Sequence, residues 1–157
     1  RFDWRRKQRM SQKDLKDEQK ESEGSPEIRQ KRARRRQQLS QQRTITAVPL
    51  ADVILTNPTH YSIALRYNPE KDMAPVCIAK GADNMAHRIR EIAAANNIPM
   101  IENKPLTRLL YDEIDVDQTI PVQHWEIVAE IISFVFDLRN NKIRKAPPGS
   151  SLRTTPY

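Results

Sequence analysis

Four consecutive residues, Asn57-Pro58-Thr59-His60, carry the groups needed to break a peptide bond without an outside nucleophile. Asparagine usually reacts when the next backbone nitrogen attacks its side chain, but proline has no N–H and closes that route. What remains is attack by the Asn57 carboxamide nitrogen on its own main-chain carbonyl. That reaction forms a succinimide and expels the Pro58 nitrogen, so the sequence predicts self-cleavage between Asn57 and Pro58.

Each of the four residues has a predicted role in this reaction. Proline holds the preceding residue in the extended region, and a turn that twists its tertiary amide by ~12° costs about 1 kcal/mol of resonance. Thr59 is expected to hold the turn. Imidazole titrates near neutral pH, so His60 is expected to move a proton from the attacking amide or to the leaving nitrogen. The alternative interpretation is an ordinary turn, because Asn-Pro often starts one.

Two apolar runs flank the motif and predict the strands that position it. Residues 53–55 are continuous, β-branched-rich and apolar, as in a strand that is buried on both faces. Residues 61–67 alternate, with an aromatic or aliphatic side chain at every odd position. The Asn-Pro bond is therefore expected in the tight connection of a hairpin.

The rest of the chain predicts two more strands and three helices. A helix over 84–96 is expected to begin at a capping Asp83 and to place Arg90 outside. A strand over 98–101 contains Pro99, which favours an edge position. The other elements are a strand over 75–79, a short helix from 103 to about 112 and a helix from Pro121 through Leu138. This order predicts an α/β fold, a small sandwich with a four-stranded mixed sheet flanked by helices.

Charge divides the chain after residue 46. Residues 1–46 carry 15 Lys or Arg and 7 Asp or Glu, a net charge of +8, whereas residues 47–157 have a net charge of −1. The first segment is polar on all sides, which predicts a long charged helical linker in which Ser25 caps a second helix. We assign 1–46 to a basic helical linker, 47–140 to a globular self-cleaving α/β domain and 141–157 to a flexible, Pro-containing tail.

Two kinds of partner suit the basic linker. One is an anionic membrane surface beside a transmembrane segment, with Phe2 and Trp4 at the interface. The other is a nucleic acid, which would be bound in a salt-sensitive manner. Composition alone leaves both open.

Composition also excludes several classes of site. The single cysteine, Cys77, cannot form an internal disulfide, and its apolar neighbours predict a buried strand thiol. Three glycines are too few for a phosphate-binding loop, and His60, His87 and His124 have no cysteine or carboxylate at metal-ligand spacing. We expect no cofactor and no metal. No apolar run approaches the ~20 residues of a membrane span, and the start at Arg1 suggests a piece of a longer protein.

The motif at 57–60 resembles the self-cleaving motif of the FlhB/YscU family, the export-switch proteins of flagellar and type III secretion systems. The likeness continues in the globular part, at residues 79–82, 88–93, 102–106, 110–111 and 120–121. The pattern from Asp14 to Ile28 is similar to the linker that follows the last transmembrane helix of the family. The longer tail favours the flagellar, FlhB-like branch, and an injectisome homologue is the alternative.

This resemblance implies the cytoplasmic domain of a flagellar protein-export gate component, at the cytoplasmic face of the bacterial inner membrane, with its own transmembrane domain missing from this chain. The implied partners are export-gate membrane proteins, a hook-length control protein and export substrates, and no nucleic acid is expected. Self-cleavage is expected once per molecule, without turnover of a substrate. It is expected to switch export from rod and hook subunits to filament subunits.

Overall fold

The computed structural model describes residues 25–153, and the chain forms two compact units, residues 1–40 and residues 41–157. The first part of the predicted linker, with Phe2 and Trp4, lies outside the described residues. The same holds for the last four residues, 154–157. The domain boundary that the charge distribution suggests after residue 46 stays a prediction.

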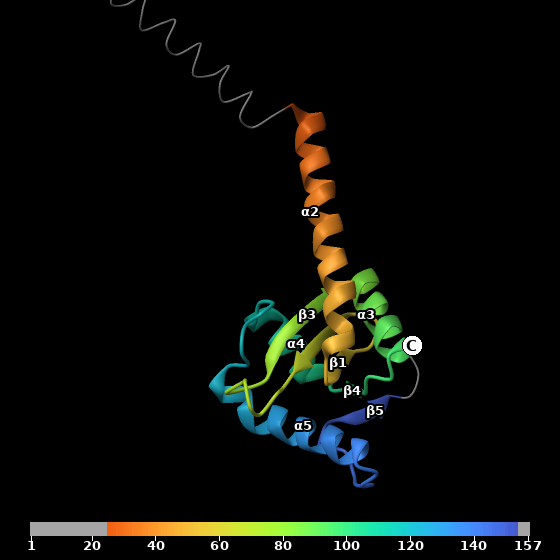
Figure 1. The fold of residues 1–157 in the computed structure, drawn as a ribbon, viewed down its shortest axis with the longest axis vertical. Helices are drawn as coiled ribbons and strands as arrows, with labels where there is room; N and C mark the ends of the chain where they lie inside the picture. Colours follow the sequence, from red (N-terminus) through yellow and green to blue (C-terminus); the bar gives the residue numbers. More distant parts are fainter. Residues whose placement is uncertain (1–24, 154–157) are drawn as a thin grey trace, which may run out of the picture. The chain divides into compact units, whose positions relative to one another are not determined.

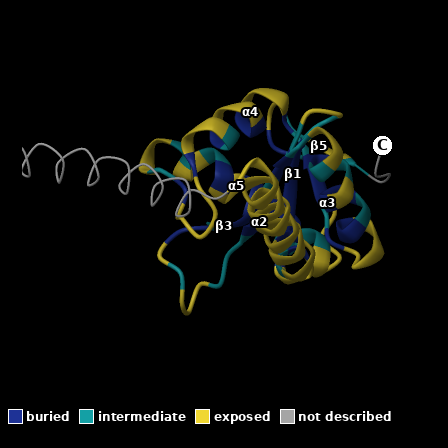
Figure 2. Cartoon of the chain, turned by 90° about the horizontal axis from the view of Figure 1, so that it is seen from above, coloured by how far each residue is buried: buried dark blue, intermediate teal, exposed yellow. Residues whose placement is uncertain are grey.

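Helix α2, Pro26–Ala47, carries mostly exposed side chains. The Ile28 N–H donates a hydrogen bond to the Ser25 hydroxyl at 3.3 Å, and Pro26 occupies the first helical position, as the sequence predicts. Thr44 is the one buried residue of α2, and Figure 2 shows the helix exposed along most of its length. A helix with so little apolar surface gains little from burial, as expected of a charged linker.

The globular unit is built on a mixed sheet that has five strands within residues 25–153 (Figure 1). The strands are β1 Val53–Asn57, β2 Tyr61–Arg66, β3 Val76–Ala82, β4 Met100–Glu102 and β5 Ser151–Arg153. Their order is β3-β2-β1-β4-β5; β1 and β4 run parallel, and the other neighbours run antiparallel. The predicted α/β fold with a mixed sheet is confirmed, but the sheet has one strand more than predicted.

The fifth strand accounts for two differences from the prediction. Residues 151–153 belong to the segment expected to be a flexible tail, yet they pair with β4. β4 therefore lies inside the sheet and not at its edge. Pro99 is compatible with this position because proline lacks only the donor, and its carbonyl accepts a hydrogen bond from the Ile54 N–H at 2.9 Å.

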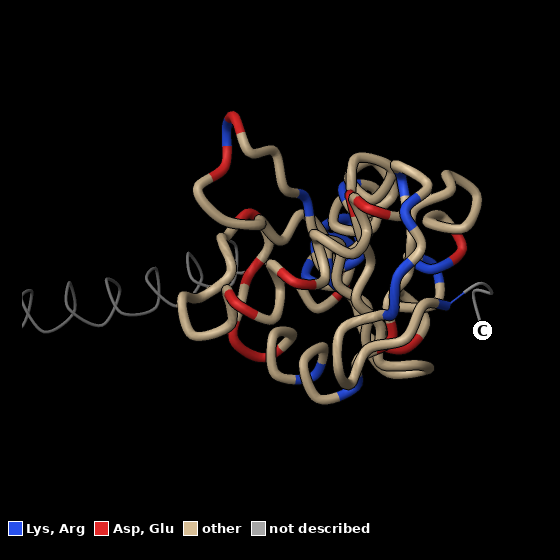
Figure 3. Tube along the Cα trace, turned by 90° about the horizontal axis from the view of Figure 1, so that it is seen from below, with Lys and Arg blue, Asp and Glu red and all other residues tan. Residues whose placement is uncertain are grey.

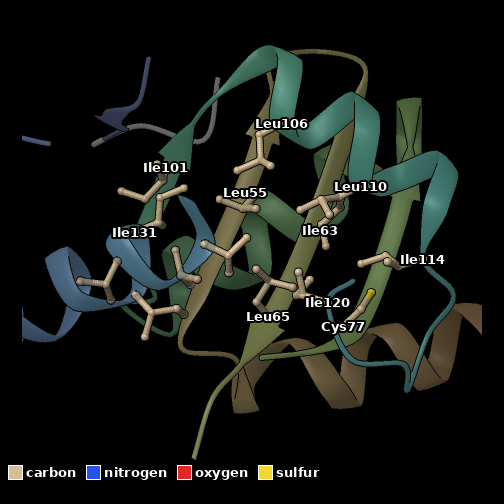
Figure 4. Packing of buried hydrophobic residues seen from close by; sticks show 14 of the residues in the cluster. Leu55, Ile63, Leu65, Cys77, Ile101, Leu106, Leu110, Ile114, Ile120 and Ile131 are labelled. Carbon is tan, nitrogen blue, oxygen red and sulfur yellow. The ribbon is translucent and has the colours of Figure 1, made fainter. Parts of the chain in front are cut away.

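Helices cover both faces of the sheet and enclose two buried clusters. The helical elements are η1 Val48–Leu50, α3 Asp83–Ala95, α4 Lys104–Glu113, η2 Val122–His124 and α5 Trp125–Arg139. The cluster beneath α4 and α5 includes Leu55 and Ile63 (Figure 4). The cluster beneath α3 includes Ile54 and Ala64. Neighbouring residues of β1 therefore enter opposite clusters, which confirms the prediction of a strand buried on both faces.

Two residues of α3 differ from their predicted positions. The residue before the helix is Ala82, and no side chain caps it; the Asp83 N–H instead donates to the His60 carbonyl at 2.9 Å. Arg90, expected outside, is only 3% exposed. Its guanidinium donates to the Ser62 hydroxyl of β2 at 3.2 Å. This hydrogen bond offsets part of the cost of burying the charge.

Cys77 is a buried strand thiol, as predicted. Burial is the largest of several influences on the Cys77 thiol, and its pKa is raised to about 11. The thiol therefore stays protonated near neutral pH, where only the thiolate is an effective nucleophile. Cys77 contributes to packing and not to chemistry.

Charged residues of both signs are spread over the globular unit (Figure 3). Ion pairs connect elements that are distant in sequence, such as Arg139 with Asp52 at 2.9 Å. Within residues 25–153, every helix is too short or too polar to cross a lipid bilayer.

Candidate functional site

The four motif residues form the turn between β1 and β2. Asn57 ends β1 and pairs with Tyr61, the first residue of β2. The His60 backbone N–H donates to the Asn57 carbonyl oxygen at 3.0 Å, which closes a four-residue β-turn with Pro58 in the second position. Thr59 has a φ of 69°, the positive value that the third position of a type II turn requires. The Asn-Pro bond thus lies in a tight hairpin connection, as predicted.

The backbone is strained at Thr59, next to the bond that is predicted to break. A β-branched residue rarely adopts a positive φ, and such a conformation costs about 1–3 kcal/mol that other contacts must offset. Contacts from α3 and α4 hold the two sides of the turn. The Asp83 N–H donates to the His60 carbonyl at 2.9 Å, and the Asn103 N–H donates to the Thr56 carbonyl at 3.2 Å. A break in the backbone here frees Thr59 to leave its strained conformation.

The hydrogen bond from the His60 N–H is directed at the atom that the reaction must activate. Attack on the Asn57 carbonyl carbon places negative charge on its oxygen, and an N–H that is already bonded to this oxygen stabilises that charge. Sequence reasoning assigned His60 a role through its imidazole and missed its backbone. The signal that could have identified the backbone contact is the Asn-Pro turn itself, because such turns usually close with an i to i+3 bond.

The side chains of the motif differ in exposure. Asn57 and Pro58 are half-buried, whereas Thr59 and His60 are exposed. Strand alternation places the Asn57 side chain on the face of β1 that α4 and α5 cover. The His60 ring lies beside Tyr61, with ring centroids 6.4 Å apart. The structure therefore brings the His60 backbone to Asn57, and proton transfer by its imidazole stays a prediction.

Three residues outside the motif support the start of β2. The rings of Tyr61 and Tyr111 stack with centroids 4.3 Å apart. The Lys80 ammonium lies 4.7 Å from the Tyr111 ring centroid and donates to the Tyr111 carbonyl at 3.0 Å. Burial, more than any nearby charge, raises the pKa of Tyr111. These residues come from β2, β3 and α4, so no local pattern in the sequence groups them, yet they anchor the strand partner of Asn57.

The chain contains a second Asn-Pro pair, Asn68-Pro69, which shares the hydrogen bond from the i+3 N–H to the asparagine carbonyl but differs in its side-chain contact and in its place in the fold. The Asn68 side-chain oxygen accepts the Glu70 N–H at 3.1 Å, an Asx turn that engages the carboxamide with the backbone. The Asn68 carbonyl accepts the N–H groups of Lys71 and Asp72 at 3.1 and 2.8 Å. This asparagine lies in an open loop after β2 and not at a strand end within a hairpin. The reactivity of the Asn57-Pro58 bond can therefore be compared with that of the Asn68-Pro69 bond in the same molecule.

An apolar hollow opens at the far end of β2 from the turn. Its lining comes from the loop after β2 and from α5, and includes Tyr67, Met73, Pro75, Trp125, Ile132 and Phe136. Met73, one of these lining residues, is 92% exposed. β2 thus connects the motif turn at its start with this hollow at its end. Within residues 25–153, no group of His, Cys, Asp and Glu is arranged to hold a metal ion.

The family model described as the FlhB HrpN YscU SpaS Family matches residues 1–135 of the chain. The chain belongs to this family. The match includes the whole charged linker, the motif turn and all of β1 to β4, so it confirms the resemblance that the motif carries.

Flagellar relatives match over most of the chain. It is 46% identical over 136 residues to the flagellar biosynthetic protein FlhB of Bacillus subtilis (strain 168), covering 87% of this chain and 38% of the relative. It is 46% identical over 138 residues to FlhB of Salmonella typhimurium (strain LT2), covering 88% of this chain and 36% of the relative. The chain thus spans less than two fifths of the length of these curated relatives. Their names support the flagellar branch.

A solved structure supports the same assignment of the fold. The chain is similar to the crystal structure of the cytoplasmic domain of FlhB from Shewanella putrefaciens, with a TM-score of 0.62 and 37% sequence identity. The similarity covers 67% of this chain and 90% of that chain. The globular unit therefore has the fold of an FlhB cytoplasmic domain.

Proposed function

We propose that this chain is the switch domain of a flagellar protein-export gate component and that it cleaves itself once, between Asn57 and Pro58. The observation that carries the proposal is the turn itself. A half-buried asparagine ends a strand, proline follows, and the His60 N–H is bonded to the carbonyl that must be attacked, at 3.0 Å. Membership of the FlhB family supports a place at the cytoplasmic face of the inner membrane.

The reaction begins with the Asn57 carboxamide nitrogen as nucleophile. It bonds to the Asn57 main-chain carbonyl carbon and loses a proton, and the resulting oxyanion is stabilised by the His60 N–H. The bond from this carbon to the Pro58 nitrogen then breaks, and that nitrogen takes up a proton to leave as a secondary amine. Asn57 ends as a C-terminal succinimide, which water later opens. His60 handles the protons, and Thr59 maintains the turn until the bond breaks.

The two fragments stay together because the sheet does not depend on the turn. β1, at the end of residues 1–57, pairs with β2 on one side and with β4 on the other. Both neighbours belong to residues 58–157. β1 is also buried in both apolar clusters, so the noncovalent contacts of a central strand survive the loss of a single peptide bond.

The cut acts on export through a surface that changes when the turn is released. By family, the partners are export-gate membrane proteins, a hook-length control protein and the exported subunits, and export passes from rod and hook proteins to filament proteins. β2 begins at the turn and ends beside the apolar hollow, which suits an apolar peptide side chain. Freeing the start of this strand is a physical link between the cut and that surface.

The chemical part of the proposal is tested with freshly made protein held at neutral pH. Intact mass under denaturing conditions should show the chain separating into residues 1–57 and 58–157, and sequencing should find Pro58 at a new N-terminus. A chain that remains intact for days would exclude the proposal. Because each molecule reacts once, added peptide substrates should not be cleaved.

The His60 imidazole is tested separately from the His60 N–H by the substitution His60→Ala. Alanine keeps the backbone donor to the Asn57 carbonyl, so cleavage should continue, but about 10²-fold slower through loss of proton transfer. The rate is measured by mass spectrometry of the new fragment over time. His87→Ala is the matched control. His87 pairs with Glu91 within α3 at 2.6 Å, and this variant should be cleaved at the original rate. An unchanged rate for His60→Ala would assign proton transfer to water.

A further inference from the structure

The C-terminal part of the globular unit is opposite in net charge to the part before it. Residues 47–137 carry 7 Lys or Arg and 13 Asp or Glu, a net charge of −6, whereas residues 138–157 carry 5 Lys or Arg and no acidic residue. Most of these cations follow directly after α5, at positions 139, 142, 144 and 145. An acidic body with one basic segment approaches an anionic surface in a preferred orientation, with that segment first.

The backbone turns where this basic segment, residues 139–145, leaves α5 (Figure 1). Asn141 has a φ of 59°, and the N–H groups of Asn141 and Lys142 donate to the carbonyls of Leu138 and Asp137 at 3.1 and 2.8 Å. These two bonds around a residue of positive φ form a Schellman motif, in which asparagine is one of the favoured residues. The segment therefore leaves the helix in a defined direction.

Two arginines attach the basic segment to the body of the unit. The Arg139 guanidinium pairs with Asp52 at 2.9 Å, and the Arg144 guanidinium pairs with Asp137 at 3.0 Å. Both guanidinium groups also lie over phenylalanine rings of α5, at 5.3 and 5.9 Å from the ring centroids. Arginine suits this role because its planar group pairs with carboxylates and stacks on aromatic rings. The segment is thus held close to both of its ends.

The other residues of the basic segment expose one apolar and two basic side chains. Ile143 is 96% exposed, the highest value among the large apolar side chains of residues 25–153. Lys142 and Lys145 are also exposed, and within the same described range neither ammonium group has an ion-pair partner. An aliphatic side chain beside unpaired cations is typical of segments that lie at the interface of an anionic bilayer.

We propose that the basic segment binds the anionic headgroups of a lipid bilayer, with Ile143 in the interface and Lys142 and Lys145 at the phosphate groups. A bilayer takes up an aliphatic side chain without a shaped pocket, and lysine binds phosphate as a point charge without a fixed geometry. The contact is separate in sequence from the basic linker and does not use the Asn57 reaction. Because so few groups bind weakly on their own, it orients a domain that is already held near a membrane.

Met73 provides a matched control position, because it is an exposed apolar side chain with acidic neighbours. It is 92% exposed, close to the value for Ile143, but Glu70 and Asp72 lie within three residues of it in the chain. A label at either position experiences the same recruitment of the chain by the basic linker. Only insertion of the labelled segment into the bilayer then differs between the two positions.

The full chain is labelled with the environment-sensitive dye NBD in Ile143→Cys and in Met73→Cys; Cys77 is buried and stays unlabelled. On vesicles of phosphatidylcholine with phosphatidylglycerol, the label at position 143 should shift its emission to the blue and be quenched by brominated lipid chains. The label at position 73 should do neither, and vesicles of phosphatidylcholine alone should shift neither label. Equal shifts at both positions, or no shift at position 143 on vesicles that carry the bound chain, would overturn the proposal.

Charge reversal tests the two lysines. Lys142→Glu with Lys145→Glu, in the chain labelled at position 143, should lower the apparent partition coefficient at least about tenfold, since each cation near an anionic leaflet contributes roughly fivefold. Lys71→Glu with Lys104→Glu changes the net charge equally and should have little effect. Equal losses in the two double variants would show that net charge alone attracts the chain and would overturn the site.

Two soluble anions separate the lipid surface from other sources of negative charge. Inorganic phosphate and polyglutamate, each added without lipid, should leave the emission of the label at position 143 unchanged. A blue shift with polyglutamate would assign the segment to an acidic protein, and one with phosphate would assign it to a free anion; either would overturn the lipid site. Asn57→Ala should change none of these values, so this test and the cleavage test can be contradicted separately.

Discussion

Asn57→Ala is expected to remain a single chain of 157 residues, whereas the unmodified protein separates under denaturing conditions into fragments of residues 1–57 and 58–157. Alanine has no nitrogen that can attack the carbonyl, and hydrolysis of the bond by water alone is far slower than attack by a group held within the same residue. Denaturing electrophoresis with intact mass measures the result. This is the largest effect expected from any single substitution, because it removes the nucleophile.

The second Asn-Pro pair is the control for this experiment. Asn68→Ala should leave cleavage at Asn57 unchanged, and the unmodified chain should show no cut between Asn68 and Pro69. The Asn68 side-chain oxygen accepts the Glu70 N–H at 3.1 Å, which orients the carboxamide in an Asx turn, so its nitrogen must leave this orientation before it can attack the Asn68 carbonyl. A cut at both bonds would mean that the dipeptide alone is sufficient and that the hairpin turn has no part in the reaction.

The same substitution tests the switch in a living cell. A full-length flagellar relative that carries this domain with Asn57→Ala should export hook subunits but no filament subunits. If the uncut protein exports both classes normally, the cleavage occurs without the proposed regulatory role. The cleavage of the purified chain and the export switch in the cell are therefore tested separately, and either can be contradicted without the other.

The hairpin around Asn57 was predictable because its determinants are local. Residues 61–67 alternate in polarity, and Asn-Pro is a turn signal that does not depend on distant contacts. With Pro58 at the second position the turn is of type II, which requires a positive φ at Thr59, and a β-branched residue disfavours that value. Backbone hydrogen bonds from Asp83 to His60 and from Asn103 to Thr56 hold the two ends of this segment.

What the sequence could not reveal depends on contacts between distant segments. Arg90 was expected outside because the amphipathic pattern of the helix put it on the polar face, but Ser62 on β2 supplies a hydrogen-bond partner in the interior. β5 was assigned to a flexible tail because Pro-Pro-Gly-Ser-Ser, residues 147–151, runs into its first residue, yet β4 pairs with its backbone. Lys80 and Tyr111 support the turn from elements that no local pattern connects to it. Patterns of a few residues predict helices and strands well, but they predict poorly which distant segments of the chain come into contact.

Gly81→Ala is expected to destabilise the fold by about 1–3 kcal/mol, the usual cost of adding a methyl group to a filled interior. Gly81 lies in β3 opposite Ser62, and α3 packs against it. An added Cβ would lie 2.5 Å from Met85 Cγ, 2.8 Å from Met85 Cβ and 3.1 Å from the Met85 backbone carbonyl carbon. Rotation of the Met85 side chain relieves only the first contact, so β3 and α3 must separate. Urea unfolding measures the loss, with Asn57→Ala present in both chains to keep them intact.

Two controls separate this steric effect from the conformational freedom of glycine. In Gly149→Ala the nearest atom to the new Cβ is 3.9 Å away, so its cost comes from the φ of +78° alone and should be about 1 kcal/mol. Gly81→Ala with Met85→Ala should recover part of the loss, because Cγ, the nearest atom, is removed while the contacts with Met85 Cβ and the Met85 carbonyl carbon remain. The Asp83 N–H that holds the His60 carbonyl lies two residues beyond Gly81. Separation of β3 from α3 should therefore also slow cleavage at Asn57 in the chain that retains this residue. A normal cleavage rate together with a clear loss of stability would show that the turn does not need the hydrogen bond from Asp83.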